Sequence, residues 1–311
     1  MKYRGRYTGH PALLAAICLL LTLAPATSPA TTRIVDPQPA DTPPRQYILW
    51  YRNYNSPAIR ALVNLALDKT PEYGRYQVVS SSMMVQQRAL RELLRADTRT
   101  VDIVNVATSQ QREEELTAIP IPIDGGLLGF RVCVTLRSNL PLFENMRSLN
   151  DFRNRKIRIG QGQHWPDTQV LRAGGIPVVT HPSYETLFVM LRNQRFECFA
   201  RGVSEVLYDL ELEGDPNLVV EPNLLLAYPM PTYLFVNPAD IETAQRLQLG
   251  LERAIEDGSF RQFLADYYQR PVHDLQLEKR TILMLDNPNL SDDSRAIGRQ
   301  ALETLRNRIR N

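Results

Sequence analysis

Short apolar runs and amphipathic stretches alternate along the chain from residue 46 onward. Apolar runs that predict buried strands occupy Gln46–Tyr51, Tyr76–Ser80 and Val101–Val106. Between the first two runs, apolar residues recur at spacings of three and four after Ser56 and Pro57, which predicts a helix capped by serine with proline in its first turn. Strands that alternate with helices in this way favour a parallel sheet with crossover helices.

The same alternation restarts in the second half of the chain. Two long extended apolar segments flank it, at Gly125–Leu136 and Leu224–Asn237. Between them the pattern predicts strands and helices in the order Lys156–Ile159 (strand), a helix ending at Ala173, Pro177–Val179 (strand), Tyr184–Asn193 (helix capped by Ser183), Phe196–Ala200 (strand) and Val203–Leu212 (helix). Helices are also predicted at Pro238–Asp257 and from Ser259, which is expected to cap the second of them. The extended segments indicate hinges near residues 127–136 and 228–236 that join two α/β units with a ligand cleft between them.

The segment Lys156–Thr168 is predicted to carry a small-molecule site. It reads as a strand, a glycine loop at Gly160 and Gly162, and a helix whose cap lies near Asp167 or Thr168. A helix start exposes backbone N–H groups, and sites in parallel sheets lie at the carboxyl ends of strands. His164 and Trp165 lie at this end of the predicted strand, where each can form a side of the site or pack within the loop.

The first 45 residues indicate export. A basic start is followed by an apolar stretch at Pro11–Leu23 and by a small-residue cleavage signal, so residues 1–26 are predicted to be a cleaved signal peptide, with cleavage after residue 30 as the alternative. A membrane anchor would need about 20 apolar residues, and this stretch is shorter. Residues 27–45 are proline-rich and predicted to be a flexible lead-in. We therefore expect a periplasmic protein.

Charge and cysteine content narrow the function. Without Lys2, Arg4 and Arg6 of the signal, the 36 basic residues fall to 33 against 34 acidic ones, so no nucleic-acid partner is expected. The mature chain keeps only Cys133 and Cys198, which either pair in an oxidising compartment or lie buried as free thiols.

An enzyme is not expected. The histidines show no metal-ligand spacing, and no nucleophile motif is present. The carboxylates Asp209, Glu211 and Glu213 read as one solvated helix and turn. No cofactor or metal is therefore predicted.

The order of several local motifs resembles the type 2 periplasmic solute-binding proteins, and within them the family 3 group of amino-acid-binding components of ABC importers. The motifs are VDIV before TSQQR, GGLLGFRVCVTL, KIRIG, RFECFA and the stretch Gly258–Tyr267, and the resemblance spans residues 46–270. It implies an α/β, two-lobed fold in which two mixed or parallel sheets are joined by two hinge strands. Residues 46–130 and 231–285 would form lobe 1, residues 131–230 lobe 2, and residues 286–311 a C-terminal tail with a helix.

The resemblance implies that Arg112 binds a ligand carboxylate. In the family, a Ser/Thr-x-x-Arg motif after the third strand supplies this arginine, and Ser109–Arg112 matches it, with Thr108 and Ser109 as hydroxyl donors. A planar guanidinium meets two carboxylate oxygens with parallel N–H donors. The alternative is an exposed arginine that pairs with Glu113–Glu115.

Two further site regions follow from the resemblance. The loop and helix start with His164, Trp165, Asp167 and Thr168 would bind the same anionic group. After RFECFA, amino-acid binders carry an acidic residue for the ligand's α-ammonium, where this chain has Arg201 and Gly202. This departure argues against an α-amino acid and for a ligand with two anionic groups or several polar oxygens, unless Arg201 instead pairs with Glu205 or Glu197.

From the other lobe, the residues after the first strand are expected to close the cleft: Tyr51, Arg52 and Tyr54. The sequence thus predicts a monomeric solute-binding protein that closes over a small polar or anionic ligand. Transport through an inner-membrane permease is the first hypothesis, and a sensory module of the same fold that docks on a receptor is the second. The tail is expected to wrap lobe 1 or to dock a partner.

Overall fold

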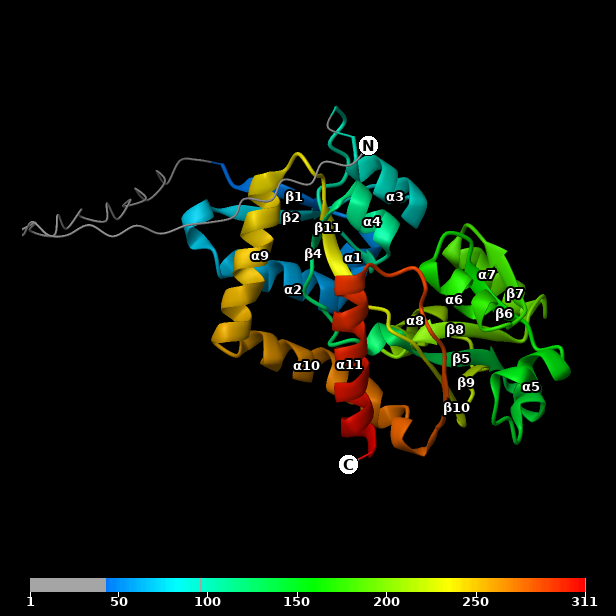
Figure 1. The fold of residues 1–311 in the computed structure, drawn as a ribbon. Coiled ribbons are helices and arrows are strands. Elements are labelled where there is room, and N and C mark those ends of the chain that lie inside the picture. The colour runs from blue at the N-terminus through cyan, green and yellow to red at the C-terminus, as the bar shows by residue number, and fades with distance from the viewer. Residues whose placement is uncertain (1–42, 96, 311) are drawn as a thin grey trace, which may run out of the picture. The chain divides into compact units, whose positions relative to one another are not determined.

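The computed structural model describes residues 43–95 and 97–310 (Figure 1). The predicted signal peptide (1–26) and the lead-in up to residue 42 lie outside the described residues. In the described part, no helix combines the length and the apolar character needed to cross a membrane.

Two small sheets lie in the region that we name lobe 1. Its elements are β1 (Arg45–Leu49), α1 (Tyr51–Asn55), α2 (Pro57–Asp68), β2 (Tyr76–Ser80), α3 (Gln86–Leu93), β3 (Val104–Ala107), α4 (Gln110–Glu115), β4 (Thr117–Ile119), β11 (Thr232–Val236), α9 (Ile241–Glu256) and α10 (Ser259–Asp274), with a 3-10 turn η1 (Pro71–Tyr73). β1 and β2 pair in parallel, as predicted, and β11 lies antiparallel between β3 and β4. A parallel bridge between Leu49 and Ile103 connects the two sheets.

A seven-stranded mixed sheet forms the region that we name lobe 2. Its strands are β5 (Phe130–Leu136), β6 (Ile159–Gly162), β7 (Val178–His181), β8 (Cys198–Gly202), β9 (Leu218–Val220), β10 (Leu224–Ala227) and β12 (Thr281–Met284), in the order β12-β10-β5-β8-β6-β7 with β9 beside β5. Its helices and turns are η2 (Leu127–Gly129), η3 (Arg137–Phe143), α5 (Leu149–Asn154), α6 (Pro166–Ala173), α7 (Tyr184–Arg192) and α8 (Val206–Glu213). The predicted α/β class with mixed sheets is confirmed, although the strands form three sheets and not two.

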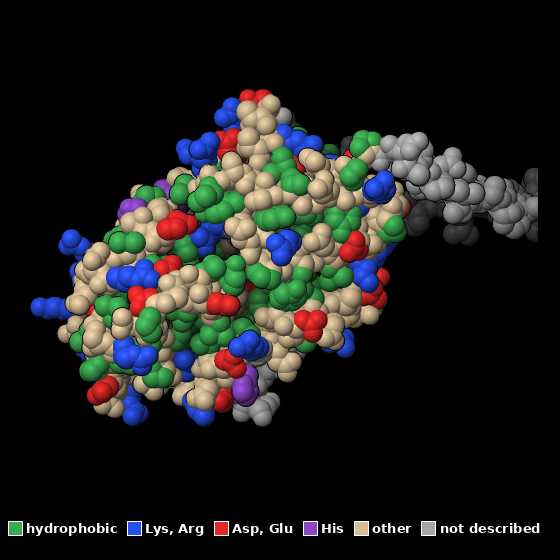
Figure 2. Space-filling model, turned by 180° about the vertical axis from the view of Figure 1, so that it is seen from behind, with side chains coloured by type: hydrophobic (Ala, Val, Ile, Leu, Met, Phe, Trp, Pro, Cys, Tyr) green, Lys and Arg blue, Asp and Glu red, His purple; other side chains and the backbone are tan. Residues whose placement is uncertain are grey.

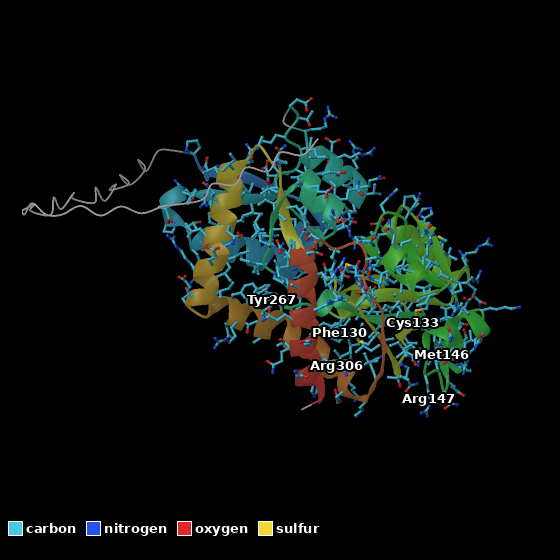
Figure 3. The ribbon with its side chains drawn as sticks, viewed as in Figure 1. Phe130, Cys133, Met146, Arg147, Tyr267 and Arg306 are labelled. Carbon is cyan, nitrogen blue, oxygen red and sulfur yellow. A yellow bond between two sulfur atoms is a disulfide. The ribbon has the colours of Figure 1, made fainter. Side chains whose placement is uncertain are left out.

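A disulfide joins two neighbouring strands of the seven-stranded sheet. Cys133 on β5 and Cys198 on β8 are bonded, with Cα atoms 5.2 Å apart, and Figure 3 labels Cys133 at this position. The structure therefore selects the paired state from the two that the sequence left open. The bond fixes the strand that leaves the first hinge to the strand that carries Arg201.

The glycine-containing segment differs from its prediction. The strand begins at Ile159 and not at Lys156, so Gly160 and Gly162 lie within β6, and neither has a positive φ. A Cβ atom on Gly160 would overlap the ring of Phe196, and one on Gly162 would overlap the ring of Trp165. These glycines thus serve the close approach of aromatic rings and not a loop.

Serine caps were predicted correctly at two helices and wrongly at a third. The Ser56 and Ser183 hydroxyls accept the N–H groups of the third helical residues of α2 and α7. Ser259 is the first residue of α10, and Gly258, with φ of 83°, holds the cap position. In the predicted site segment the cap is Trp165, because proline at 166 starts the helix earlier than expected.

Helices α2 and α9 pack closely in lobe 1. Gly250 of α9 lies against the backbone of Ala66, where a Cβ atom would overlap the Ala66 carbonyl oxygen. On the same helix Arg246 is fully buried, and its guanidinium donates to the Thr70 hydroxyl (3.1 Å), the Tyr47 hydroxyl (3.1 Å) and the Gly74 carbonyl (2.9 Å). No ion pair of Arg246 is found among the described residues.

The tail contacts both lobes. Beyond the turn η4 (Leu277–Lys279), β12 extends the lobe 2 sheet by pairing with β10, although residues up to 285 were expected in lobe 1. Helix α11 (Asp292–Arg310, red in Figure 1) then begins beside α4, where the Glu113 carboxylate accepts from the hydroxyls of Ser291 (2.6 Å) and Ser294 (2.7 Å). The tail is therefore part of the folded structure of both lobes.

Candidate functional site

A cavity of about 720 Å³ is lined by residues of both lobes. Lobe 1 contributes α1, the end of β3 and α4, and lobe 2 contributes β5, the start of α6, the start of α7, the end of β8 and α8. Of the ten predicted site residues, four line this cavity: Arg112, Trp165, Asp167 and Arg201. The cleft expected between two α/β units is thus present.

Arg112 lies buried at the junction of the two lobes. Its guanidinium donates to the Ala107 carbonyl, to Gln86 Oε1 (3.1 Å) and, across the cleft, to the His164 carbonyl (3.2 Å). It does not pair with Glu113–Glu115, which was the alternative. Burial lowers the pKa of Arg112 to about 10, because the nearby negative charges do not compensate for the lost hydration.

Four other predicted residues surround Arg112 and the start of α6 without lining the cavity. The Thr108 hydroxyl donates to Glu113 (2.5 Å), and the Ser109 hydroxyl caps α4 by accepting from the Arg112 N–H (3.3 Å). The Thr168 hydroxyl donates to the Gly162 carbonyl (2.9 Å), and the His164 side chain is exposed. Their hydroxyl groups therefore already have partners within the protein.

The last two predicted residues, Gly202 and Tyr54, also lie outside the cavity lining. A Cβ atom on Gly202 would lie 2.9 Å from Arg131 Nη1 and 3.0 Å from Glu205 Oε2, so an arginine side chain fills the space beside this position. The ring of Tyr54 stacks with the guanidinium of Arg60 at 5.3 Å and packs against the core.

A buried ion pair forms the hinge side of the site. Arg131 on β5 binds Asp167 on α6 at 2.6 Å, and both side chains are almost completely buried. The Tyr228 hydroxyl lies between them, accepting from Arg131 Nε (3.2 Å) and donating to Asp167 Oδ1 (2.8 Å). Asp167 is thus held by lobe 2 itself, with its charge balanced.

Arg201 takes part in a second buried pair. It binds Asp209 at 2.8 Å and Glu205 at 3.1 Å, which agrees with the salt-bridge alternative for Glu205. Asp209 also accepts from the Tyr184 hydroxyl (2.5 Å). The expectation that Asp209 lies on a solvated helix is wrong, because the inward face of α8 turns this carboxylate toward Arg201.

Aromatic rings cover the Arg201 guanidinium. Its carbon lies 4.9 Å from the centre of the Tyr184 ring, 5.2 Å from that of Phe199 and 5.3 Å from that of Trp165. Trp165 and Phe199 are stacked, with ring centres 6.2 Å apart. Trp165 therefore both lines the cavity and packs on lobe 2.

Residues after the first strand reach across the cleft, as predicted for Tyr51 and Arg52. Glu185 at the start of α7 accepts from the Tyr51 hydroxyl and from Arg52, both at 3.2 Å. The Arg52 guanidinium also lies 3.7 Å from the centre of the Tyr184 ring. These contacts hold the described lobes together on this side of the cavity.

Asp124, on the segment between β4 and η2, is a buried carboxylate at the cavity. It accepts from the N–H groups of Gly126 (3.0 Å) and Leu128 (2.7 Å) and from the Ser204 hydroxyl (3.1 Å) of lobe 2. Burial raises its pKa to about 6, and nearby Glu205 adds to this effect. Within the described chain it has no cationic partner.

Sequence reasoning did not identify Asp124, Arg131 or Tyr184 as site residues. Arg131 stands in an otherwise apolar run, Phe130–Leu136, and a lone arginine in a buried strand is the signal that could have identified it. For Asp124 the signal is a carboxylate directly before the two glycines of the predicted hinge. The sequence contains no such signal for Tyr184, because an aromatic residue at the start of a helix is equally typical of a residue that only packs in the core.

Comparison with protein-family models finds no match, and comparison with curated protein sequences finds none. Comparison with solved structures finds many similar folds at low identity. A Salmonella typhimurium periplasmic binding protein described as highly specific for arginine is 13% identical, covers 72% of this chain and 99% of its own, and has a TM-score of 0.51. An amino-acid ABC transporter substrate-binding protein of Streptococcus pneumoniae, bound to L-arginine, is 10% identical over 72% and 94% of the chains (TM-score 0.54).

A third similar structure is the ancestral amino-acid-binding protein AncCDT-1, described as a precursor of cyclohexadienyl dehydratase. It is 11% identical over 72% and 95% of the chains, with a TM-score of 0.52. The chain therefore has the two-lobed fold of periplasmic binding proteins, as the sequence motifs implied. At these identities the likeness is one of fold.

Proposed function

We propose that the protein captures a small carboxylate-bearing ligand in the cleft between its lobes and hands it to a transporter. One observation carries the proposal: Arg112 is a buried cation at the junction of the lobes whose described partners are all neutral. Burying a charge without an opposite charge is costly, and an anionic ligand would supply the missing partner. The contacts of Tyr51 and Arg52 with Glu185 already join the lobes beside the cavity, so the lobes would separate there to admit the ligand and close again around it.

The similar structures support this assignment. Two of them are described as binding arginine, which carries a carboxylate. Transport from the periplasm after cleavage of residues 1–26, with a membrane permease as partner, is the setting that we propose. We also propose that residues 46–130 and 231–285 belong to lobe 1 and residues 131–230 to lobe 2, except that β12 pairs with β10 in the lobe 2 sheet.

Ligand capture is tested with purified protein. Thermal shift against carboxylates, amino acids and sugar acids is followed by calorimetric titration of each hit. A ligand at 100 times its dissociation constant stabilises a protein by about 2.7 kcal/mol, which gives a clear shift of the melting temperature. Arg112→Gln should weaken each hit at least tenfold.

A matched control separates binding from stability. Arg280 is also buried, donates to the Leu275, Glu221 and Leu224 carbonyls and lies outside the cavity lining. Arg280→Gln should therefore lower the melting temperature without changing any affinity. Unchanged affinity in Arg112→Gln, or the same loss in both variants, would show that Arg112 does not bind the ligand.

A further inference from the structure

Two buried charges at the cavity lack a charged partner, and they have opposite signs. Among the other buried charges of the cavity, Arg131 pairs with Asp167 and Arg201 pairs with Asp209. Nearer the surface, Glu205 pairs with the same two arginines, Arg52 with Glu185 and Arg270 with Asp274. Among the described residues, no ion pair includes Arg112 or Asp124, and these are the two unpaired charges. A ligand with one negative and one positive group would give each of these two residues a charged partner.

The remaining carboxylates of the cavity interior are already bound. Asp167 accepts from Arg131 and the Tyr228 hydroxyl, and Asp209 accepts from Arg201 and the Tyr184 hydroxyl. A ligand cation would have to displace a buried guanidinium to reach either of them. Asp124 accepts only from uncharged N–H and O–H groups, so a cation gains there the full attraction of an unpaired charge.

We propose that the ligand is zwitterionic, that Arg112 binds its carboxylate and that Asp124 binds its ammonium or guanidinium group. The inference rests on the proposed function, because it takes the carboxylate on Arg112 as given. It assigns the cationic group to the hinge side of the cleft, in front of η2, and not to the end of β8, where Gly202 lies beside the Arg131 guanidinium.

The surroundings of Asp124 agree with this role. The charged and titratable groups around it are Glu205 at the start of α8 and Tyr268 on α10, and neither supplies a positive charge. In the empty site, burial holds the pKa of Asp124 near 6, so protonation competes with a bound cation at mildly acidic pH. The affinity for a zwitterion should thus fall up to tenfold per pH unit below about 6.

A purely structural role is the alternative, since Asp124 also fixes the turn at η2. Asp151 provides the matched control: its carboxylate accepts from the N–H groups of Arg147 (2.8 Å) and Ser148 (2.9 Å) outside the cavity. Asp124→Asn and Asp151→Asn each exchange a backbone-binding carboxylate for an amide. Both should cost stability, and only the first should change binding.

The test is calorimetric titration with compounds that differ only in a cationic group. Suitable sets are valerate, norvaline and 5-aminovalerate, and arginine with its deamino counterpart 5-guanidinovalerate. We expect wild type to bind at least one zwitterion tenfold or more tightly than valerate, Asp124→Asn to remove this preference, and Asp151→Asn to keep it. For wild type alone, lowering the pH from 7 to 5 should weaken that zwitterion about tenfold. Valerate should weaken by less than about twofold, because only its own carboxylate begins to take up a proton.

The outcomes separate the two proposals. If valerate binds as tightly as the zwitterions, or if Asp124→Asn keeps the preference, or if wild type shows no pH effect, the assignment of Asp124 is wrong while carboxylate capture by Arg112 stands. If none of these compounds nor any other carboxylate binds wild type, the proposed function itself falls. The pH series needs no variant, so a misfolded Asp124→Asn protein leaves the inference testable.

Discussion

The buried guanidinium of Arg246 should be among the largest single contributions to the stability of lobe 1. Its donors reach two hydroxyls and the Gly74 carbonyl within 3.1 Å, and the rings of Tyr47, Tyr73 and Tyr76 lie 5.4–5.6 Å from its carbon. Replacement by methionine keeps most of the side-chain volume and removes every donor. The Thr70 and Tyr47 hydroxyls and the Gly74 carbonyl then lose this donor.

The expected cost follows from these contacts. Each hydrogen bond to a charged donor contributes about 1.5–3 kcal/mol, and three short ones give roughly 4–9 kcal/mol. These contributions already include the cost of taking the guanidinium out of water. Because methionine keeps most of the buried volume, the lower end of the range applies, a loss of about 4–5 kcal/mol for Arg246→Met. At about 2–4 °C per kcal/mol, the melting temperature should fall by roughly 10 °C.

Urea unfolding followed by circular dichroism measures this loss. Arg253→Met on the same helix is the control, because Arg253 is partly exposed and its pair with Glu72 (2.7 Å) should contribute about 0–1 kcal/mol. If Arg246→Met lost less than about 1 kcal/mol at an unchanged m-value, or no more than Arg253→Met, the account of Arg246 as a hydrogen-bonding centre of lobe 1 would be refuted.

Three further predictions concern stability. The pKa of Asp124 is raised from 3.8 to about 6 in the folded protein, so its protonation stabilises the fold fully below pH 4, and this contribution of about 3 kcal/mol is lost as the pH rises through 6. The free energy of unfolding should therefore fall between pH 4 and 7 in wild type, and Asp124→Asn should remove this pH dependence. An unchanged pH dependence in the variant would contradict the prediction. The disulfide closes a sequence separation of 65 residues, so replacing Cys133 and Cys198 by serine should destabilise by about 2–4 kcal/mol in chemical denaturation, and reduction should not affect the double variant further. Gly250→Ala places a methyl group against Ala66 and should cost about 2–3 kcal/mol in the same assay, whereas Gly258→Ala, where the space is open, should cost only the strain of its positive φ.

The alternation of apolar runs and amphipathic stretches was enough to predict the fold class. It identified β1, β2 and β8 within a residue or two, because each strand lies in a short run rich in aromatic, aliphatic or β-branched residues. It misplaced β6, because glycines within a strand read as a loop unless the rings that pack on them are known. That β12 adds to the lobe 2 sheet depends on contacts with β10, which no local pattern contains.

The candidate site was predictable in part. The motif Ser109–Arg112 predicted Arg112 as a site residue, and Arg112 lines the cavity between the lobes. The sequence did not predict the surrounding ion pairs, because which arginine pairs with which carboxylate depends on how β5 and β8 pack against α6 and α8. Asp209 illustrates this: its sequence neighbours are acidic, and only the position of α8 turns it toward Arg201.

The positions of β11 and β12 also bear on how this chain folds as it is synthesised. β11 is the central strand between β3 and β4, so Val104 finds its partner Phe235 only after more than two thirds of the chain has been made. Likewise, Leu224 can pair with Thr281, at the edge of the lobe 2 sheet, only after Thr281 has been synthesised. Contacts between such distant residues form slowly because a long loop must close first. On a ribosome-bound chain the β1–β2 sheet can therefore form early, whereas the β3-β11-β4 sheet stays incomplete until residue 236 has emerged, and β3 and β4 remain accessible to chaperones until then.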